Sequence, residues 1–508
     1  MIAIEFDIVS LRRRLWQILP GALSWGTLIS LTLLSFFVPY WIAIFVIAYD
    51  VYVLVRIVYM STHLIYAYRQ LKAHRTINWM EKLQQLPKAE MGWDDIHHYI
   101  VVPTYNESLE VLHSTLSSLK ASTFPAENLH VVVGFEERAG TDAQERAQAL
   151  TMEFGSYFRT FLTTFHPDGL PNEKRVKSAN ACWAIKKLEE KTKDLNIPVP
   201  HVLVSNLDSD TVLPSQYFAY LTHVFLEQED KYQASYQPIP VYNNNLWDAP
   251  SFSRVIAMGS TFWQMIESTR PERLVTFSSH SMTLLALQEV GYWQRDIISE
   301  DSRIFWQALL HYAGNYRAQP LYITVSMDAA LADSWWKTLK NQYRQKRRWA
   351  WGIENFPYIM EGFLRNREIP FDRKFPYLFR TLEGHFSWAT APIIVAGLGW
   401  LPIIFGSPEF HATFLSYSLP FVARTLMSIA MSGLVISAAL TLLLSPPRPA
   451  HYTWWRHIQF VLQWILVPII SMILSAFPAL DAETRLLLGR DLHFNVMQKS
   501  RKKVHVAT

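Results

Sequence analysis

The chain has 508 residues, of which 50% are hydrophobic and 14% aromatic, and its formal net charge at pH 7 is +4. This composition is too apolar for an ordinary soluble enzyme, too rich in charge for a bundle lying wholly in the bilayer, and too close to neutral to indicate a nucleic-acid partner. A single cysteine, Cys182, excludes an intramolecular disulfide framework and fits a reducing compartment.

Two apolar runs near the N-terminus predict membrane-spanning helices at about residues 19–38 and 40–59, because a helix needs roughly 20 mostly apolar residues to cross a bilayer. No small-residue cleavage site closes the first run, so we expect an uncleaved anchor. Asp50 and Arg56 interrupt the second run, and we expect them to pair or to reach toward the bilayer surface. Basic residues flank the two runs and place the following domain in the cytoplasm.

The next part of the chain, residues 95–350, alternates short apolar runs with amphipathic stretches. The sequence predicts strands at about 99–103, 129–133 and 201–204, and helices at about 107–119 and 179–188. This alternation is typical of a parallel, doubly wound sheet. Ligands bind beyond the carboxyl ends of the strands in such sheets, and Tyr105, Glu136 and Asp208 fall just after those ends.

The pair Asp208 and Asp210 is a candidate metal motif. Two carboxylates at a strand end suit Mg²⁺, which keeps most of its waters and takes few carboxylates together with substrate phosphates. A turn is the structural alternative, because Asp and Ser favour turns and Pro214 follows closely. For this motif alone, the turn is preferred.

A second acidic motif, Glu300 and Asp301, begins a predicted helix at about 302–310. Ser299 is placed to cap this helix, and acidic side chains are favoured in a first turn. That structural role is compatible with catalysis. A general base needs one carboxylate at the acceptor hydroxyl, and we choose Asp301.

A third motif contains Gln345, Arg348 and Trp349, which share one face of a predicted helix. Arginine binds diphosphate oxygens, and tryptophan stacks beneath a sugar ring or walls its pocket. The alternative is an interfacial helix whose basic side chains meet anionic lipid. The two interpretations use opposite faces, so both can hold.

After Trp351 the sequence becomes aromatic and interfacial, and apolar runs follow at about 388–405, 425–444 and 460–477. The expected parts of the chain are two transmembrane helices in 1–66, an amphipathic linker in 67–94, the catalytic domain in 95–350, an interfacial segment in 351–383, three to four transmembrane helices in 384–480, and a basic tail in 481–508.

With these motifs in this order, the chain resembles membrane-bound family 2 glycosyltransferases of the processive type, such as the cellulose, hyaluronan and poly-N-acetylglucosamine synthases. The resemblance covers residues 95–350 and the layout of apolar runs around them. It implies an α/β fold of the GT-A class, with a Rossmann-like, mostly parallel sheet. The cytoplasmic domain would be inserted between the N-terminal and C-terminal transmembrane helices of a multi-pass protein of the bacterial inner membrane.

The resemblance also implies donor-binding residues. Thr104, Tyr105 and Glu107 stand in a match to the family's PTYNE segment, which holds the uridine. Lys177 matches the lysine that meets the nucleotide phosphates in a K-x-x-N segment. Where the family has an Asp that recognises uracil, this chain has Glu136 and Glu137. Either substitutes with a longer reach, or both have a capping or surface role.

Further matches imply the catalytic residues. Asp208 and Asp210 match the metal motif, for Mg²⁺ or Mn²⁺, and Asp301, beside Glu300, matches the base of the TED motif with a serine in place of threonine. Gln345, Arg348 and Trp349 match QxxRW in spacing. From their position in the sequence, residues 236–238 and 277–280 are expected to line the donor or acceptor pocket. The alternative, a packing role, is at least as well supported.

A last resemblance is that of residues 494–499 to the FxVTxK gating loop of cellulose synthases, with Met497 in place of threonine. The alternative is a disordered basic tail. A gating loop needs a cytoplasmic tail, whereas three crossings after the catalytic domain would put the tail outside. A re-entrant run, or an extra segment near Pro420, would resolve the conflict.

The expected function is inverting transfer from a UDP-sugar. Asp301 would deprotonate the acceptor hydroxyl, the metal would stabilise the departing UDP with help from Arg348, and Trp349 would lie by the acceptor sugar. A growing polysaccharide is the favoured acceptor. Single transfer to a lipid, as in ceramide glucosyltransferases, and a non-catalytic membrane scaffold are the alternatives. Expected partners are membrane lipid and an export subunit, and no nucleic acid.

Overall fold

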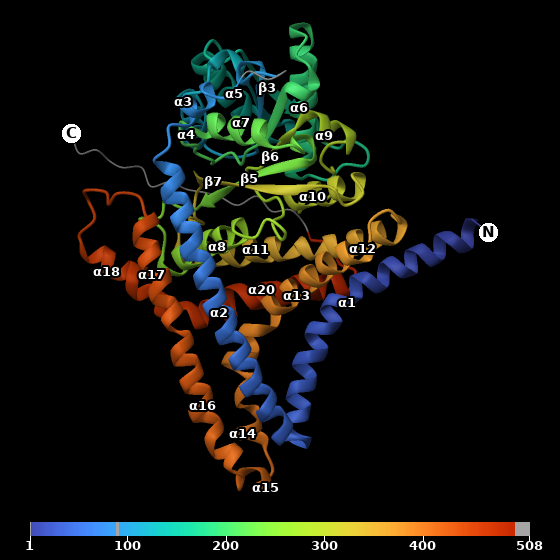
Figure 1. Cartoon of the computed structure of the whole chain (residues 1–508), viewed down its shortest axis with the longest axis vertical. Coiled ribbons are helices and arrows are strands. Elements are labelled where there is room, and N and C mark those ends of the chain that lie inside the picture. The colour runs from blue at the N-terminus through green and yellow to red at the C-terminus, as the bar shows by residue number, and fades with distance from the viewer. Residues whose placement is uncertain (1, 88–90, 493–508) are drawn as a thin grey trace.

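The molecule has two parts of different character, which the computed structural model describes for residues 2–87 and 91–492. Figure 1 shows a sheet domain at one end and long helices running from it toward the other end. The gating-loop segment at 494–499 lies outside the described residues.

A seven-stranded sheet forms the centre of the domain, in the order β3-β2-β1-β4-β6-β5-β7. Neighbouring strands run parallel except at β6, which is antiparallel to β4 and β5. The strands are β1 (His97–Pro103), β2 (Leu129–Glu136), β3 (Thr160–His166), β4 (Val202–Asn206), β5 (Ala234–Val241), β6 (Ser281–Thr283) and β7 (Arg317–Ser326). The expected mostly parallel sheet is confirmed.

The central strands are valine-rich and buried, with Val101, Val102 and Val132 all inaccessible to solvent. β-Branched side chains favour the extended backbone, and a continuous apolar run is typical of a parallel strand covered on both faces. The strands expected at 99–103, 129–133 and 201–204 are β1, β2 and β4, with β2 continuing to Glu136.

Helices cover the sheet and begin where local chemistry favours them. Ser108 caps α4 by accepting a hydrogen bond from the Val111 N–H at 3.4 Å. The helices of the domain are α3 (Trp79–Gln84), α4 (Leu109–Lys120), α5 (Thr141–Phe154), α6 (Lys177–Thr192), α7 (Tyr217–Glu227), α8 (Ser251–Ser268), α9 (Leu284–Glu289) and α10 (Glu300–His311). The helices expected at 107–119 and 179–188 are α4 and α6.

The expected side-chain cap of α10 is wrong. Ser299 occupies the N-cap position, but its hydroxyl donates to Glu354 Oε1 at 2.8 Å and makes no capping bond. Glu300 and Asp301 do lie in the first turn of the helix, where the positive end of the helix dipole favours acidic groups. Ser299 therefore joins α10 to the segment before α12 (Asn355–Arg365).

Beneath the sheet, α11 (Trp335–Ala350) lies across the molecule, and α13 (Phe371–Ala396) descends from α12 (Figure 1). Four stretches are long and apolar enough to span a membrane, by length and composition: Leu11–Phe37, Pro39–Arg75, Phe414–Leu444 and Trp455–Leu487. A bent pair, Phe371–Ala396 and Leu398–Phe405, passes the same test with a bend of 45°, as either a broken span or a re-entrant loop.

These stretches correspond to helices in the first 75 residues and after the sheet domain. They contain α1 (Ile2–Phe37), α2 (Pro39–Arg75), α14 (Leu401–Phe405), α16 (Phe414–Ala430), α17 (Ser432–Leu444), α18 (Trp455–Leu462), α19 (Val467–Ser471), a π-helix (Met472–Ala476) and α20 (Phe477–Leu487), with the short α15 (Pro408–His411) in the turn before α16. Pro39 opens α2 at a position where its missing N–H costs nothing.

The expected pairing of Arg56 with Asp50 is wrong. Arg56 Nη1 lies 2.7 Å from Glu383 Oε1 on α13 and also donates to Tyr52 Oη and Ser387 Oγ. Residues three or four apart face each other on a helix, whereas a spacing of six points them to different sides. The ion pair therefore joins α2 to α13.

Candidate active site

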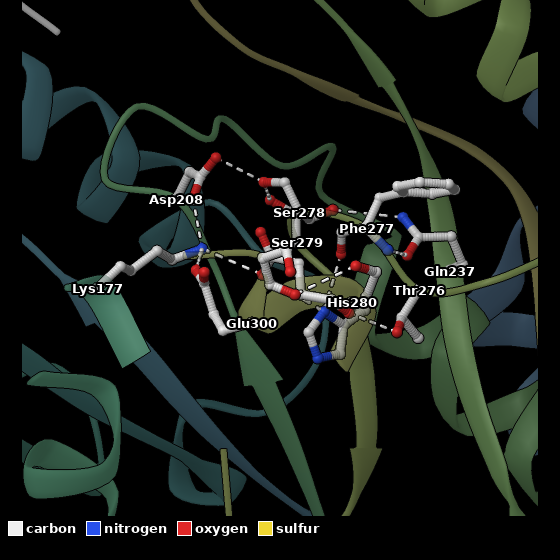
Figure 2. Close-up of polar contacts among 12 residues, drawn as sticks. Lys177, Asp208, Gln237, Thr276, Phe277, Ser278, Ser279, His280 and Glu300 are labelled. Carbon is white, nitrogen blue, oxygen red and sulfur yellow. Dashed lines mark hydrogen bonds and ion pairs between the residues drawn. The ribbon is translucent and has the colours of Figure 1, made fainter. Parts of the chain in front are cut away.

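Three acidic side chains meet around one lysine, and Figure 2 shows two of them, Asp208 and Glu300, beside Lys177. Lys177, at the first position of α6, has its Nζ 2.5 Å from Asp208 Oδ1, 3.3 Å from Asp301 Oδ1 and 3.8 Å from Glu300 Oε1. Asp208 follows β4, and the other two acids open α10. The carboxyl end of a parallel strand and the N-termini of two helices therefore supply one charged cluster.

The lysine and the acids of this cluster shift one another's pKa values. Burial alone would lower the pKa of Lys177, but the negative charges of Asp208, Asp301 and Glu300 outweigh it and raise the pKa. Burial and the neighbouring Asp301 raise the pKa of Glu300, while Lys177 lowers it. Glu300 is 4% exposed, whereas the Asp301 side chain is 24% exposed. Asp301 is thus the more accessible of these two adjacent carboxyl groups.

The two aspartates of the metal motif have different surroundings. Asp208 accepts a hydrogen bond from Ser278 Oγ at 2.6 Å (Figure 2). Asp210 is fully buried and accepts from the Asp328 N–H at 2.8 Å, while Asn244 Nδ2 donates to the Asp210 carbonyl and to Asp328 Oδ1. A buried hydrogen-bond network thus fixes the loop after β4, which a simple surface turn would not need.

These aspartates fit a cation that takes its other ligands from water and phosphate. Within residues 2–87 and 91–492, no group of three His, Cys, Asp or Glu side chains forms a ready metal cage. An ammonium already lies against Asp208, so the position favours positive charge. Mg²⁺ and ions like it need only one or two protein carboxylates beside substrate phosphates.

The loop after β1 is held by its own glutamate. Glu107 Oε2 accepts from Thr104 Oγ1 at 2.7 Å and from the Tyr105 N–H at 2.8 Å. Asn180 of α6 donates to the carbonyls of Thr104 and Gly134 at 3.2 and 2.6 Å. Glu107 therefore shapes the loop, and Asn180 ties the loop to the helix that carries the central lysine.

A cavity of about 100 Å³ opens beyond the ends of β2 and β3. Its lining includes Glu136, His166, Asp168, Arg175 and Val176. β3 was not predicted from the sequence, so His166, Asp168, Arg175 and Val176 were not predicted as cavity residues. A sequence signal that could have pointed to them is the cluster of turn and charged residues before α6.

Glu136 of the cavity wall is joined to an aromatic and charged pair outside the lining. The Arg138 guanidinium lies 4.2 Å from the centre of the Tyr105 ring and pairs with Glu136. Glu136 is buried, whereas Glu137 is exposed. Of the two glutamates considered from sequence, the structure therefore brings only Glu136 to the cavity.

The segment before β6 lies against Asp301. Thr276 Oγ1 donates to the Asp301 carbonyl at 2.5 Å, and the buried His280 places Nδ1 2.8 Å from the Phe277 carbonyl and 3.9 Å from Asp301 Oδ1. Gln237 of β5 accepts from the Phe277 N–H at 2.7 Å (Figure 2). The segments 236–238 and 277–280 are thus packed together beside the acidic cluster, and burial lowers the pKa of His280.

The QxxRW face of α11 looks toward the same cluster. The Trp349 ring lies 5.9 Å from that of Tyr242, and burial together with the charges of Asp208 and Asp210 raises the pKa of Tyr242. Sequence reasoning missed Tyr242, which lies between the metal motif and the tryptophan. Gln345 is buried and accepts from Gln342 Nε2 at 3.0 Å.

The basic side chains of α11 turn inward in two cases. Lys346 Nζ lies over the rings of Trp349 and Trp388 at 4.9 and 5.5 Å, and Arg347 pairs with Asp481 of α20 at 2.8 Å. These two positions contact protein, contrary to the interfacial interpretation in which they meet lipid.

The family model that matches this chain is described as glycosyl transferase family group 2, and the match covers residues 203–478. No curated protein matches the chain in sequence. Similar solved structures include the mannosyltransferase PcManGT from Pyrobaculum calidifontis with GDP-Man and Mn²⁺, at 15% identity over 78% of this chain and 99% of that one, with a TM-score of 0.43.

Another similar structure is TarS 1-349 of S. aureus in complex with UDP-GlcNAc, at 12% identity over 80% of this chain and 98% of that one, with a TM-score of 0.36. The family match extends from β4 to α20 and takes in more than half of the chain. The motifs around Lys177 therefore sit in an enzyme, a glycosyltransferase that belongs to glycosyl transferase family group 2.

Proposed function

We propose that this enzyme transfers a sugar from a UDP-sugar to an acceptor hydroxyl with inversion, and that it does so repeatedly to extend a polysaccharide. The observation that carries the proposal is the cluster of acidic side chains around Lys177. Carboxyl oxygens of Asp208, Asp301 and Glu300 lie 2.5, 3.3 and 3.8 Å from the Lys177 ammonium nitrogen. Such a cluster supplies the two things that sugar transfer needs, a base and a positive site for the leaving diphosphate.

The nucleotide would bind at the cavity beyond β2 and β3. Tyr105 and Arg138 present a flat surface to a base, and the Glu136 carboxylate accepts a hydrogen bond from an imino N–H such as that of uracil. The diphosphate would then extend toward Lys177, which lies at the N-terminus of α6, where the helix dipole favours negative charge.

The metal site would consist of Asp208 and Asp210, with the remaining ligands supplied by water and the diphosphate. A bound Mg²⁺ or Mn²⁺ would supply positive charge to the oxygens of the leaving group. Arg348, on the face of α11 that carries Trp349, would add a further cation there.

The acceptor hydroxyl would give its proton to Asp301 while its oxygen attacks the anomeric carbon. The bond from that carbon to the diphosphate breaks, its electron pair leaves with the nucleotide, and the configuration inverts. His280 and Thr276 would hold Asp301 in place through the contacts at 3.9 and 2.5 Å. Trp349 and Tyr242 would wall the acceptor sugar.

The experiment that tests this proposal uses purified protein in lipid nanodiscs with Mn²⁺ and a panel of radiolabelled UDP- and GDP-sugars, with Asp301→Asn as control. We expect high-molecular-weight product from one UDP-sugar and none from the control. A single labelled lipid as the product would mean that the enzyme transfers one sugar to a lipid and does not extend a polymer. Activity only with a GDP-sugar would overturn the assignment of uracil as the nucleobase of the donor. Undiminished product from the Asp301→Asn control would overturn the assignment of Asp301 as the catalytic base.

A further inference from the structure

The apolar stretch Trp455–Leu487 is long enough to cross a membrane, yet both of its ends contact the sheet domain. Near its start, Arg456 Nη2 donates to the Trp247 carbonyl at 3.0 Å. Near its end, Asp481 Oδ2 pairs with Arg347 Nη1 at 2.8 Å. Trp247 follows β5 of the sheet domain, and Arg347 lies on α11, whose Trp349 packs on Tyr242 of that domain. The domain lies on one side of any bilayer, so both ends of the stretch lie on that side.

The middle of the stretch also contacts the domain and the helices beneath it. Gln463 Oε1 accepts from Arg254 Nε at 2.7 Å, and the Trp464 ring stacks on Phe262 at 5.6 Å. Ser475 accepts from the Trp388 indole N–H at 2.7 Å. A helix that crosses a hydrocarbon core of about 30 Å cannot keep such contacts along its whole length.

The picture agrees with these contacts. In Figure 1, α1, α2, α13–α14 and α16–α17 run toward the end of the molecule opposite the sheet, whereas α20 lies across their upper ends, close beneath α11, and α18 lies beside α17. The stretch therefore has a protein-covered side and a side that faces away from the domain.

The side that faces away is an apolar stripe. Leu462, Ile465, Ile469, Ile473 and Phe477 recur every three or four residues and are 41–65% exposed. Trp454 and Trp455, more than half exposed and stacked on each other at 4.1 Å, stand at its start. Tryptophans at one end of an apolar helical stripe are typical of helices that lie at the membrane surface.

We propose that residues 455–487 do not cross the bilayer but lie in its surface on the side of the catalytic domain, with the apolar stripe in the boundary between headgroups and acyl chains. The crossings are then α1, α2, α13–α14 and α16–α17. An even number of crossings returns the chain to the catalytic side, so residues 488–492 follow on that side. The inference is independent of the proposed donor and acceptor.

The first test measures sidedness with single cysteines in a Cys182→Ser background. Cys182 is buried, so its removal lowers labelling background without altering the surface. Met152→Cys marks the catalytic domain, Glu409→Cys marks the turn between α14 and α16, and Arg490→Cys marks the exposed residues that follow α20. In sealed vesicles, we expect an impermeant maleimide to label 152 and 490 from one side and 409 from the other. Labelling of 490 together with 409 would overturn the proposal.

The second test measures depth and uses a matched pair of isoleucines. Ile469 is 57% exposed in the stretch, and Ile429 is 52% exposed in the middle of Phe414–Leu444. A nitroxide at Ile469→Cys should lie about 5–10 Å below the headgroups, and one at Ile429→Cys near the bilayer centre, as read from collisions with oxygen and a polar nickel complex. Equal depths at the centre would show that the stretch crosses the membrane.

Discussion

Two adjacent acids, Glu300 and Asp301, illustrate how burial separates the roles of chemically similar side chains. Both lie in the first turn of α10 and near Lys177. Glu300 is buried, and its raised pKa favours the neutral acid, whereas Asp301 is partly exposed next to His280. In the proposed mechanism, the buried Glu300 supports the site and the partly exposed Asp301 takes the proton of the acceptor.

Isosteric substitutions test this separation. Asp301→Asn removes the base and should lower kcat by about 10²–10⁴-fold with little change in donor KM. Glu300→Gln keeps the shape of the Glu300 side chain and should lower kcat by less than about tenfold. Steady-state kinetics on both proteins, with donor binding by calorimetry, makes the comparison. An equal loss of kcat in both variants would contradict the assignment of Asp301 as the catalytic base.

The environment of Lys346 predicts a pH dependence. Burial lowers the pKa of Lys346 to about 8, below its ordinary value of 10.5. Between these values the folded state binds fewer protons than the unfolded state, so the unfolding free energy rises with pH across that window. Below about pH 8 the buried charge is fully present and opposes folding.

Lys346→Met should therefore raise the Tm relative to the original protein at pH 7, and the difference should shrink as the pH rises from about 8 toward 10.5. Melting curves of the two proteins in the same nanodiscs over this range measure it, because all other groups titrate alike in both. A difference that stays constant with pH would mean that the Lys346 ammonium is not penalised by burial.

At the scale of elements, the contact between β2 and α6 sets the position of Lys177. A Cβ at Gly134 would lie 2.5 Å from Asn180 Oδ1 and 3.1 Å from the Ala184 Cβ. The same asparagine donates to the Thr104 and Gly134 carbonyls. The glycine thus permits the close approach that brings the lysine-bearing helix to the strand ends.

Gly134→Ala should cost about 1–3 kcal/mol of unfolding free energy through overpacking and should lower activity, because α6 must move. Gly259→Ala on α8 is the matched control, since a Cβ there meets nothing within 4 Å. The control should be neutral or slightly stabilising, as alanine favours helices over glycine. Thermal unfolding and kcat are measured for both, and a neutral Gly134→Ala would contradict the role given to this contact.

The elements also show what sequence alone could predict. β1, β2 and β4 were predictable because their buried valine runs are local signals, and the QxxRW face followed from helical spacing. β6 was not, because it has three residues and exists only through pairing with β4 and β5. Motif order placed Asp208 near Asp301, but the contacts of Tyr242, His280 and Arg138 depend on tertiary packing with no periodic signal.

At the scale of the whole molecule, apolar runs predict helices but not their direction. Residues 460–477 were expected to cross the bilayer from their composition, which they share with α16–α17. Only contacts such as Asp481 with Arg347 distinguish a helix against the domain from one that leaves it. Sequence periodicity cannot supply such contacts, because they join residues more than 130 positions apart.

This ion pair also joins the membrane part to the catalytic helix. Arg347 lies beside Arg348 and Trp349 on α11, and both partners are less than a third exposed. We expect Asp481→Asn and Arg347→Gln to lower kcat by similar amounts while donor KM stays unchanged. A double-mutant cycle on kcat should give a coupling of about 0.5–3 kcal/mol, the range for residues in contact.

Arg485→Gln is the control for this cycle, because it removes a partner of Asp481 that lies on α20, at 2.8 Å, and leaves the side chains of α11 in place. It should leave kcat nearly unchanged, since a pair within one helix at i and i+4 contributes little. If Arg485→Gln lowers kcat as much as Asp481→Asn does, order within α20 is what matters. If the effects of Asp481→Asn and Arg347→Gln on kcat are additive, α11 works independently of α20.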